Sequence, residues 1–311
     1  MERLEAFRLY YNHTIFPELL RMERRRRRLV ALLVFAVVLL AGMIVFELYL
    51  NILVLTLALA IPHTLFIVYL LYQIRQFINT FKPNVVELLL DFIDNGPNFD
   101  ANYPLAYDAE GGMSKERFLQ SGIFVTPGQF YKAEDAIRGR IGEINFELCE
   151  VHVKEISPVR NDLDEVFRGI YLEARFTAAL RGRMMVWPRE RRQFLTRAIK
   201  QFTAAGGVPV EHEINNPTFR QYFMTYATPN THVEGILPDT MQEAIVQYRK
   251  ETGKTIYFAF HNQDFCVAIA EPKDLLEPNI LRSNLSFDLV LEFMRDINLI
   301  LRIVHEFDQK I

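Results

Sequence analysis

The 311-residue sequence is poor in the residues that build common small-molecule and metal sites. Its two cysteines, Cys149 and Cys266, are too few for a disulfide framework and cannot form a zinc site by themselves. Glycine is also scarce, and neither G-x-G-x-x-G nor G-x-x-x-x-G-K-[ST] occurs, which argues against a phosphate-cradling loop. We therefore expect two reduced, buried thiols and no cofactor.

Charged side chains are almost absent from one long block near the N-terminus. Residues 29–72 contain one formally charged residue, Glu47, in 44 positions. Residues 1–28 carry eight Arg and four Glu, whereas residues 73–311 carry 27 basic and 33 acidic residues. A domain with this acidic balance offers no overall basic face, so nucleic acid is not an expected partner.

The uncharged block is long enough for two membrane spans and too long for one, because a transmembrane helix needs about 20 apolar residues. We expect spans at 29–46 and 52–72, joined by a tight hairpin at 47–51. Cationic residues stand before the first span and after the second, and the hairpin has none, which predicts that both termini are cytoplasmic. A cleaved signal peptide fits poorly, since the apolar run starts late and a second follows. The sequence thus predicts a multi-pass inner-membrane protein in contact with the lipid bilayer.

An unbroken run of arginines precedes the first span: Arg24, Arg25, Arg26, Arg27 and Arg28. Such a run sets topology and attracts anionic lipid headgroups, at about 1 kcal/mol per residue close to the surface. It ends a segment, 1–28, whose apolar residues recur at three- and four-residue steps and predict an amphipathic cytoplasmic helix. This helix either lies on the bilayer surface or packs on the cytoplasmic domain.

Pro62 and His63 stand near the centre of the second expected span, where an ionisable ring is costly to bury. Two interpretations follow. In one, His63 is a proton-responsive or ligand-facing group, and oligomerised hairpins form a pore around it. In the other, it is a neutral imidazole hydrogen-bonded to a carbonyl freed by Pro62 or to a neighbouring helix. We favour the second, because buried polar groups usually find such partners.

The rest of the chain predicts a helical linker and a mixed domain. The linker, 73–97, is expected to start a new helix at Pro83 and to end at Asn95-Gly96. Residues 98–311 predict a cytoplasmic α+β domain with a mainly antiparallel sheet, a long C-terminal helix and a candidate sub-boundary near 206. Strands are expected at 141–156, 169–180, 183–187, 255–260 and 265–270, hairpin turns at 181–182 and 261–264, and helices at 114–120, 189–202, 238–252 and 286–307.

The strand expected at 141–156 changes phase at Cys149. Apolar side chains occupy even positions from Ile144 to Leu148 and odd positions at Val151 and Val153. A β-bulge near Cys149 would keep both halves facing the same core, and we expect one there.

Two polar clusters are candidates for chemistry. The Glu-His-Glu sequence at 211–213 lacks a second histidine at helical spacing, so a solvated cluster is favoured over a metal site. Adjacent Glu134 and Asp135 fit charge compensation at a helix start better than acid and base roles, although with His152 they are the candidates for an unrecognised enzyme site. Catalytic residues stay unknown.

Several short motifs together resemble a bacterial two-pass inner-membrane protein family that is defined only by a domain of unknown function. They are Phe118-x-x-Ser121-Gly122-Ile123-Phe124, Tyr131-x-x-Glu134-Asp135-x-x-x-Gly139, Phe167-Arg168-Gly169-Ile170, and Phe219-x-x-x-Phe223-x-x-Tyr226 before Leu237-Pro238. The resemblance implies the two-span architecture and implies no catalytic residue or cofactor.

These observations favour a non-enzymatic scaffold or protein-interaction component that presents a cytoplasmic domain at the inner membrane. A protein partner or self-association is expected, because the membrane linkage is rigid and the chain has 25 Phe and 13 Tyr. Two alternatives stay open: a membrane-anchored enzyme with an unrecognised site, and a pore or transport subunit formed by oligomerised hairpins.

Overall fold

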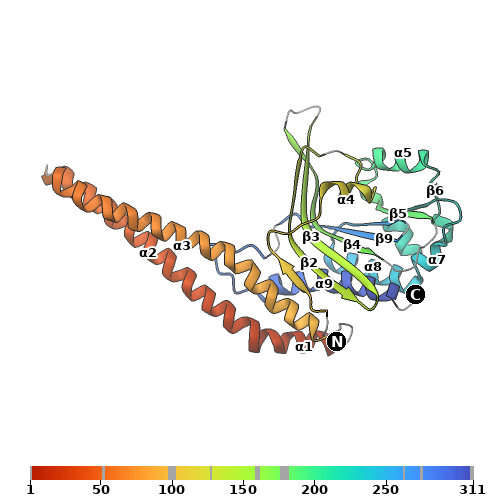
Figure 1. The fold of residues 1–311 in the computed structure, drawn as a ribbon, viewed down its shortest axis with the longest axis horizontal. Coiled ribbons are helices and arrows are strands. Elements are labelled where there is room, and N and C mark those ends of the chain that lie inside the picture. Colours follow the sequence, from red (N-terminus) through yellow and green to blue (C-terminus); the bar gives the residue numbers. More distant parts are fainter. Residues whose placement is uncertain are drawn as a thin grey trace. The chain divides into compact units, whose positions relative to one another are not determined.

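A computed structural model describes residues 2–50, 53–96, 103–126, 128–157, 162–175, 182–261, 263–273 and 276–308. The chain divides into two compact units. Unit 1 is Met1–Phe92 with Leu276–Leu291, and unit 2 is Ile93–Leu275 with Glu292–Ile311. The architecture is α+β, with long N-terminal helices, an antiparallel sheet and a C-terminal helix, which confirms the predicted fold class (Figure 1).

Unit 1 is built on two long antiparallel helices, α2 (Phe16–Leu50) and α3 (Leu53–Asp94), which lie side by side (Figure 1). Helix α2 runs on through most of the expected hairpin loop. Helix α3 passes through Pro62 and Pro83 without a break, so the helix start predicted at Pro83 is wrong. A proline inside a helix removes one backbone hydrogen bond, and here buried residues on both sides, Phe81 and Val85, hold the helix together.

The N-terminal segment is helical, as predicted. Helix α1 (Glu2–Tyr10) continues through a π-helical turn (Tyr11–Ile15) into α2. Its apolar stripe is buried: Phe7, Tyr11 and Ile15 are at most 5% exposed. The ring centroid of Phe7 lies 5.1 Å from that of Phe92, on α3. The ring centroid of Tyr11 lies 4.8 Å from that of Phe287, a residue of the expected cytoplasmic domain. The stripe thus packs within unit 1, both on α3 and on a segment of that expected domain, in partial agreement with the second placement.

The middle parts of α2 and α3 present apolar side chains outward. Phe35 is 65% exposed, Val38 63% and Leu65 65%. The helical stretches Glu5–Phe46 and Ala58–Asp94 are each long and apolar enough to cross a membrane, and only 6% of either apolar window is buried. Contiguous exposed apolar surface of this kind is typical of contact with lipid or with another protein.

Unit 2 contains one nine-stranded sheet in the order β1-β2-β3-β4-β9-β8-β5-β7-β6, with every pair antiparallel. The strands are β1 (Ala106–Asp108), β2 (Phe130–Ile141), β3 (Ile144–Ile156), β4 (Leu163–Arg175), β5 (Arg183–Pro188), β6 (Val208–Pro209), β7 (Phe223–Ala227), β8 (Ile256–His261) and β9 (Asp264–Ala270). Strands from both sides of position 206 share this sheet, and the sub-boundary expected there stays a prediction.

Two hairpins were predicted in the sheet, and one is confirmed. Strands β8 and β9 pair directly, as expected for 255–270. The described strands β4 and β5 do not pair, because β9 and β8 lie between them. The hairpin expected between these two strands is therefore wrong, because β4 pairs with β9, a segment almost 90 residues later in the chain, which local turn signals cannot indicate. Residue 181 of the expected turn and the end of the expected strand, 176–180, lie outside the described residues.

Three of the four predicted helices of the mixed domain form where expected. The helices and helical turns are α4 (Lys115–Gln120), a 3₁₀ turn (Arg189–Arg191), α5 (Thr196–Ala204), a 3₁₀ turn (Glu211–Glu213), α6 (Pro217–Tyr222), α7 (Val233–Ile236), α8 (Asp239–Thr252) and α9 (Phe287–Asp308). Ser114 caps α4 by accepting a hydrogen bond from the Arg117 N–H, and Ser286 caps α9 in the same way. The helix expected at 189–202 begins instead at Thr196.

The sheet is covered on both faces, and this explains the phase change at Cys149. Cys149, Val151 and Val153 belong to one core cluster with Phe118 of α4 and Phe202 of α5. Leu148 is also buried and, by the alternation of side chains along a strand, it points to the other face of the sheet. Strand β3 pairs residue by residue with β4 through this point, so the bulge predicted in β3 is wrong. An irregularity does lie opposite Cys149, but in β2, between Glu134 and Ile137, and a further register shift falls between Val153 and Lys154 in the pairing of β3 with β4. The two halves of β3 bury side chains on opposite faces of the sheet, so the change of phase requires no extra residue in this strand.

Two of the motifs that carry the family resemblance have structural explanations. In the Ser-Gly-Ile-Phe corner after α4, the Ser121 hydroxyl donates to the Phe118 carbonyl at 2.7 Å, and the Trp187 indole N–H donates to the Ile123 carbonyl at 3.2 Å. In the Phe-Arg-Gly-Ile motif, a Cβ at Gly169 would lie 2.0 Å from the carbonyl oxygen of Ile269. Only glycine allows this approach of β9 to β4.

Candidate functional site

The face of the sheet beside α4 changes from apolar to charged along its strands. Tyr171, paired with Cys149 and Ala268, belongs to the core beneath α4. Two residues further along β4 stands Glu173, paired with Glu147 of β3. Because alternate residues of a strand share a face, Glu173 and Glu147 lie on the same face of the sheet as Tyr171, just beyond the apolar core beneath α4.

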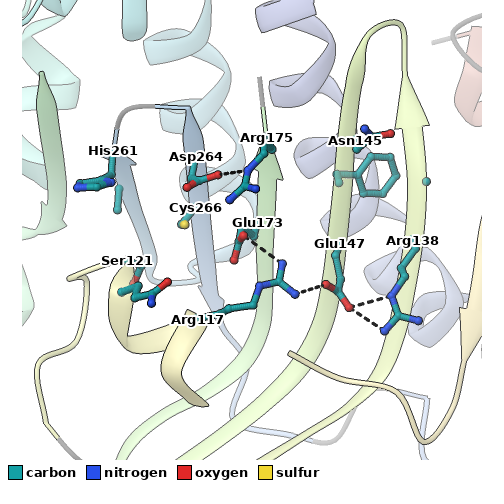
Figure 2. Close-up of a pocket in the computed structure, with 14 residues that line it drawn as sticks. Arg117, Ser121, Arg138, Asn145, Glu147, Glu173, Arg175, His261, Asp264 and Cys266 are labelled. Carbon is teal, nitrogen blue, oxygen red and sulfur yellow. Dashed lines mark hydrogen bonds and ion pairs between the residues drawn. The ribbon is translucent and has the colours of Figure 1, made fainter. Parts of the chain in front are cut away.

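A recess of about 840 Å³ lies over these charged positions. Its lining comes from α4 and from strands β2, β3, β4, β9 and β8, and Figure 2 shows the polar members pointing into it. We call it the charged recess and define it by Arg117, Arg138, Glu147, Glu173, Arg175 and Asp264.

Arg117 of α4 is the centre of the charged recess. Its two terminal nitrogens lie 2.6 Å from a carboxylate oxygen of Glu147 and 3.0 Å from one of Glu173 (Figure 2). Arg138 of β2 donates to the second oxygen of Glu147 at 2.8 Å. The result is a row of alternating charge across β2, β3 and β4. Charge-assisted hydrogen bonds of this length are stronger than neutral ones and fix the positions of the guanidinium groups.

Carboxylates form the base of the charged recess and arginines form its rim. The side chains of Glu147 and Glu173 are each 12% exposed, whereas that of Arg138 is 49% exposed and that of Arg175 is 65% exposed. Burial by itself would raise the pKa of Glu147, but hydrogen bonds from Arg117 and Arg138 outweigh burial and lower it. Glu147 thus stays ionised at neutral pH, and the arginines keep further N–H groups that are not used in these bonds.

The recess contains no activated nucleophile among its described residues. Burial raises the pKa of the Cys266 thiol to about 12, so the thiol is protonated and unreactive at neutral pH. Burial also lowers the pKa of His261, at the end of β8. The Ser121 hydroxyl donates its hydrogen bond to the Phe118 carbonyl. This arrangement can bind a charged group. Its described residues include no nucleophile paired with a general base, as acyl transfer would require.

A second charged cluster lies inside unit 2. The Lys254 ammonium is 2.7 Å from an oxygen of Asp296, 2.6 Å from one of Glu271 and 3.0 Å from one of Glu292. The Asp296 side chain is fully buried and also accepts a hydrogen bond from the Tyr248 hydroxyl. Burial opposes the charge of Lys254, but the three carboxylates outweigh burial and raise its pKa. The charge of the Lys254 ammonium is thus compensated by carboxylates, as is typical of a buried cluster that stabilises the fold.

The arginine run before the first expected span divides between two faces of α2. Arg26 is 7% exposed; it donates to both oxygens of Glu23, at 2.7 and 2.9 Å, and to the carbonyl of Ile280. Arg24, Arg25 and Arg28 are exposed. Helical geometry produces this division, because residues three and four apart share a face.

His63 makes a hydrogen bond within the hairpin. Its Nε2 atom lies 2.8 Å from the Ala36 carbonyl oxygen of α2, and since a carbonyl only accepts, Nε2 is the donor. A contact to a neighbouring helix is what the second interpretation of His63 predicted, and the role of His63 stays a prediction. Pro62 lies inside α3, one residue earlier.

The other polar candidates lie outside the charged recess. Glu134 and Asp135 are in β2, so the helix start predicted for them is wrong. Asp135 has a φ of 59° at the irregularity in this strand and accepts a hydrogen bond from Tyr107. His152, in β3, lies 3.3 Å from Glu165.

The Glu-His-Glu sequence forms a 3₁₀ turn on the surface, where the His212 side chain is 77% exposed. Within the part of the chain that the structure describes, no group of three or more His, Cys, Asp or Glu side chains is arranged to hold a metal ion.

Sequence reasoning missed the charged recess, because its members are spread over residues 117–264. One signal was present. The odd positions of β3 change from polar, at Asn145 and Glu147, to apolar, at Val151 and Val153. This change marks the place on one face of the sheet where the apolar core beneath α4 and α5 ends.

Comparisons with known proteins match part of the chain to a family. Residues 165–309 match a family described as "Protein of unknown function (DUF3137)". This match confirms the resemblance to a family defined only by a domain of unknown function, over the segment from β4 to α9. No curated protein matches the chain. Among solved structures, the crystal structure of the mycobacterial trehalose monomycolate transport factor A, TtfA, is similar at 11% identity and a TM-score of 0.32, covering 64% of this chain and 88% of that chain.

Proposed function

We propose that this protein is a non-enzymatic interaction component anchored in the inner membrane. In this proposal the hairpin crosses the bilayer through 29–46 and 52–72, and both termini lie in the cytoplasm. Unit 2 presents the charged recess to a protein partner or to a second copy of the chain. The observation that carries the proposal is the recess itself, in which fixed arginines form an exposed rim and no activated nucleophile is present.

The exposed apolar surface of α2 and α3 supports the membrane part of the proposal. Side chains such as Phe35 and Val38 are more than half exposed, and transfer of apolar surface out of water is worth about 25 cal/mol per Å². The helix lengths and the arginines before the first span support crossing with the N-terminus in the cytoplasm.

The rim arginines suggest the chemistry of the partner. Arg117, Arg138 and Arg175 use part of their N–H groups on carboxylates at the base and direct the others outward. A planar guanidinium binds a carboxylate through two parallel hydrogen bonds, so an acidic segment is the best match. The residues that define the recess are three arginines and three carboxylates, so its exposed arginine rim, and not a net positive charge, is what such a segment would contact.

The two other hypotheses have less support. For an enzyme, Glu134, Asp135 and His152 would have to share a cleft with a substrate, and these residues do not line the charged recess. For a pore, His63 would have to face a lumen, and its ring nitrogen is engaged by Ala36 of the same hairpin.

Photo-crosslinking in intact membranes tests the proposal. A benzoyl-phenylalanine is placed in the full-length protein at Gln120, an exposed residue that lines the recess. The matched control has the same replacement at Gln247, an exposed glutamine of α8. We expect an adduct from position 120 and none from 247. Mass spectrometry then separates a second copy, at twice the 36.4 kDa chain, from a different protein.

Two results would count against the proposal. One is the absence of a specific adduct at position 120 together with a strictly monomeric protein in detergent. The other is recovery of the full-length protein in solution without a surfactant, which would remove the membrane anchor.

A further inference from the structure

A second hollow, of about 960 Å³, lies in unit 1 beside the start of the first expected span. Its charged lining consists of Arg21, Arg24, Arg25, Arg28 and Glu18. The geometry points to a binding site for the phosphate of an anionic phospholipid headgroup. This inference rests on the proposed membrane anchoring and goes beyond the diffuse attraction expected of a basic run.

The spacing of the arginines makes the hollow a defined site. Positions 21, 24, 25 and 28 lie on one face of α2, because residues three, four and seven apart are neighbours on a helix. Together they extend about 10 Å along the helix axis. Over this length, guanidinium groups at different heights along α2 can contact the same lipid headgroup.

Arg26 and Arg27 do not belong to this face. Arg26 is held in the interior of unit 1 by Glu23 and the Ile280 carbonyl, and Arg27 lies 2.9 Å from Glu23. Five consecutive arginines thus have two uses. Glu23 neutralises part of the run and turns Arg26 inward, while Arg24, Arg25 and Arg28 stay on the exposed face.

The charges of the hollow are mostly uncompensated. Glu18 lies 3.8 Å from Arg21, and both side chains are exposed, so this pair is weak. Arg25 donates to the side-chain oxygen of Gln73, which is uncharged. Among the described residues, none forms an ion pair with Arg24 or Arg28. An anion entering the hollow therefore meets guanidinium groups that still have N–H groups to donate.

The position of the hollow selects a lipid over a soluble anion. Arg28 is followed directly by Leu29, the first residue of the expected span, and Leu29 itself lines the hollow. A ligand there contacts guanidinium groups at one end and apolar surface at the other. A phospholipid has both parts, and free phosphate has only the first.

Lipid retention by the full-length protein in detergent tests this inference, with bound lipids counted by native mass spectrometry. The probes are phosphatidylglycerol, with one phosphate, cardiolipin, with two, and zwitterionic phosphatidylcholine. Sodium phosphate is the soluble competitor. We expect retention of the two anionic lipids, little retention of phosphatidylcholine and no displacement by sodium phosphate at matched concentration.

A pair of substitutions separates a defined site from diffuse charge. Arg25→Gln and Arg27→Gln remove the same charge two residues apart, from exposed side chains, and only Arg25 lines the hollow. We expect R25Q to need about fivefold more phosphatidylglycerol for half saturation. R27Q should match the wild type, and R28Q should repeat the result of R25Q.

Equal weakening by R25Q and R27Q would overturn the inference, as would equal retention of phosphatidylcholine or displacement of lipid by sodium phosphate. Thermal unfolding without anionic lipid checks that R25Q folds as the wild type does. Failure of this experiment leaves the crosslinking result at Gln120 unaffected, so the two proposals can fail separately.

Discussion

The two units of this protein treat apolar side chains in opposite ways. In unit 1, Phe35 and Val38 of α2 point outward and are more than half exposed. In unit 2, Trp187 and Phe118 are completely buried, between a sheet and the segments that cover it. The chain has similar residues in both places, so the difference lies in what covers them: other parts of the chain in unit 2 and, in the proposal above, lipid in unit 1. The two units therefore respond differently to the same chemical change.

The largest expected effect is the loss of a buried charge in unit 2. Asp296→Ala removes the partner of Lys254 and Tyr248 and leaves an excess of desolvated polar groups. We expect a decrease of about 3–5 kcal/mol in the free energy of unfolding, measured by thermal or denaturant unfolding. Glu292→Gln is the control: Glu292 also contacts Lys254, but its side chain is 43% exposed, so its loss should cost less than about 1 kcal/mol. Equal effects would show that burial does not govern this cluster.

A charge on the outer surface of α2 tests the other half of the comparison. Val38→Lys should cost about 2.5–3.5 kcal/mol of apparent insertion free energy if this surface faces lipid. Val208→Lys, at a position 48% exposed in unit 2, should be nearly neutral. The measurement is the inserted fraction of full-length protein after membrane fractionation. If V38K inserted as well as the wild type, the exposed surface would not face lipid.

The buried pair in unit 1 predicts a pH dependence. Hydrogen bonds from Arg26 hold the pKa of Glu23 at about 2, against an ordinary value near 4.5. A carboxyl with a lowered pKa stabilises the fold above its unfolded pKa, and this contribution disappears as the pH falls toward 2. Thermal unfolding of the wild type and of Glu23→Gln should differ at pH 7 and converge between about pH 4.5 and 2. A constant difference over this range would contradict the role of the ion pair.

The smallest effect on stability is expected at the rim of the charged recess. Arg175 pairs with Asp264 at 2.7 Å, but its side chain is 65% exposed, so Arg175→Gln should change the free energy of unfolding by about 0–1 kcal/mol. The same variant should reduce the crosslinked adduct formed from position 120. An unchanged adduct would separate Arg175 from partner binding, and a strongly destabilised variant would assign it to the fold instead.

Much of the fold could be predicted from local sequence signals. The caps at Ser114 and Ser286, the hairpin of β8 and β9 and the two long apolar helices follow from residues near each other in the chain. The errors share one cause. The bulge placed at Cys149, the hairpin at 181–182 and the helix start at Pro83 all depended on what packs against a segment, and distant residues provide that packing.

The candidate sites show the same limit. The arginine run was visible as a run, but its division into Arg26, turned inward, and Arg24, Arg25 and Arg28, on the exposed face, depends on Glu23 and on a segment near residue 280. The charged recess was not visible at all, because Arg117, Glu147 and Glu173 meet only when α4 is set across β3 and β4.

By itself, the sequence determined where charged side chains are absent and where they concentrate, since an uncharged block and an acidic remainder follow from composition along the chain. It also determined the elements whose start and stop signals are local. Tertiary structure alone decided which face of β3 is covered at each end, and which arginines are buried and which are exposed. The physical reason is range: helix caps, turns and hydropathy act over a few residues, whereas burial and ion pairing depend on residues that only the folded chain brings together.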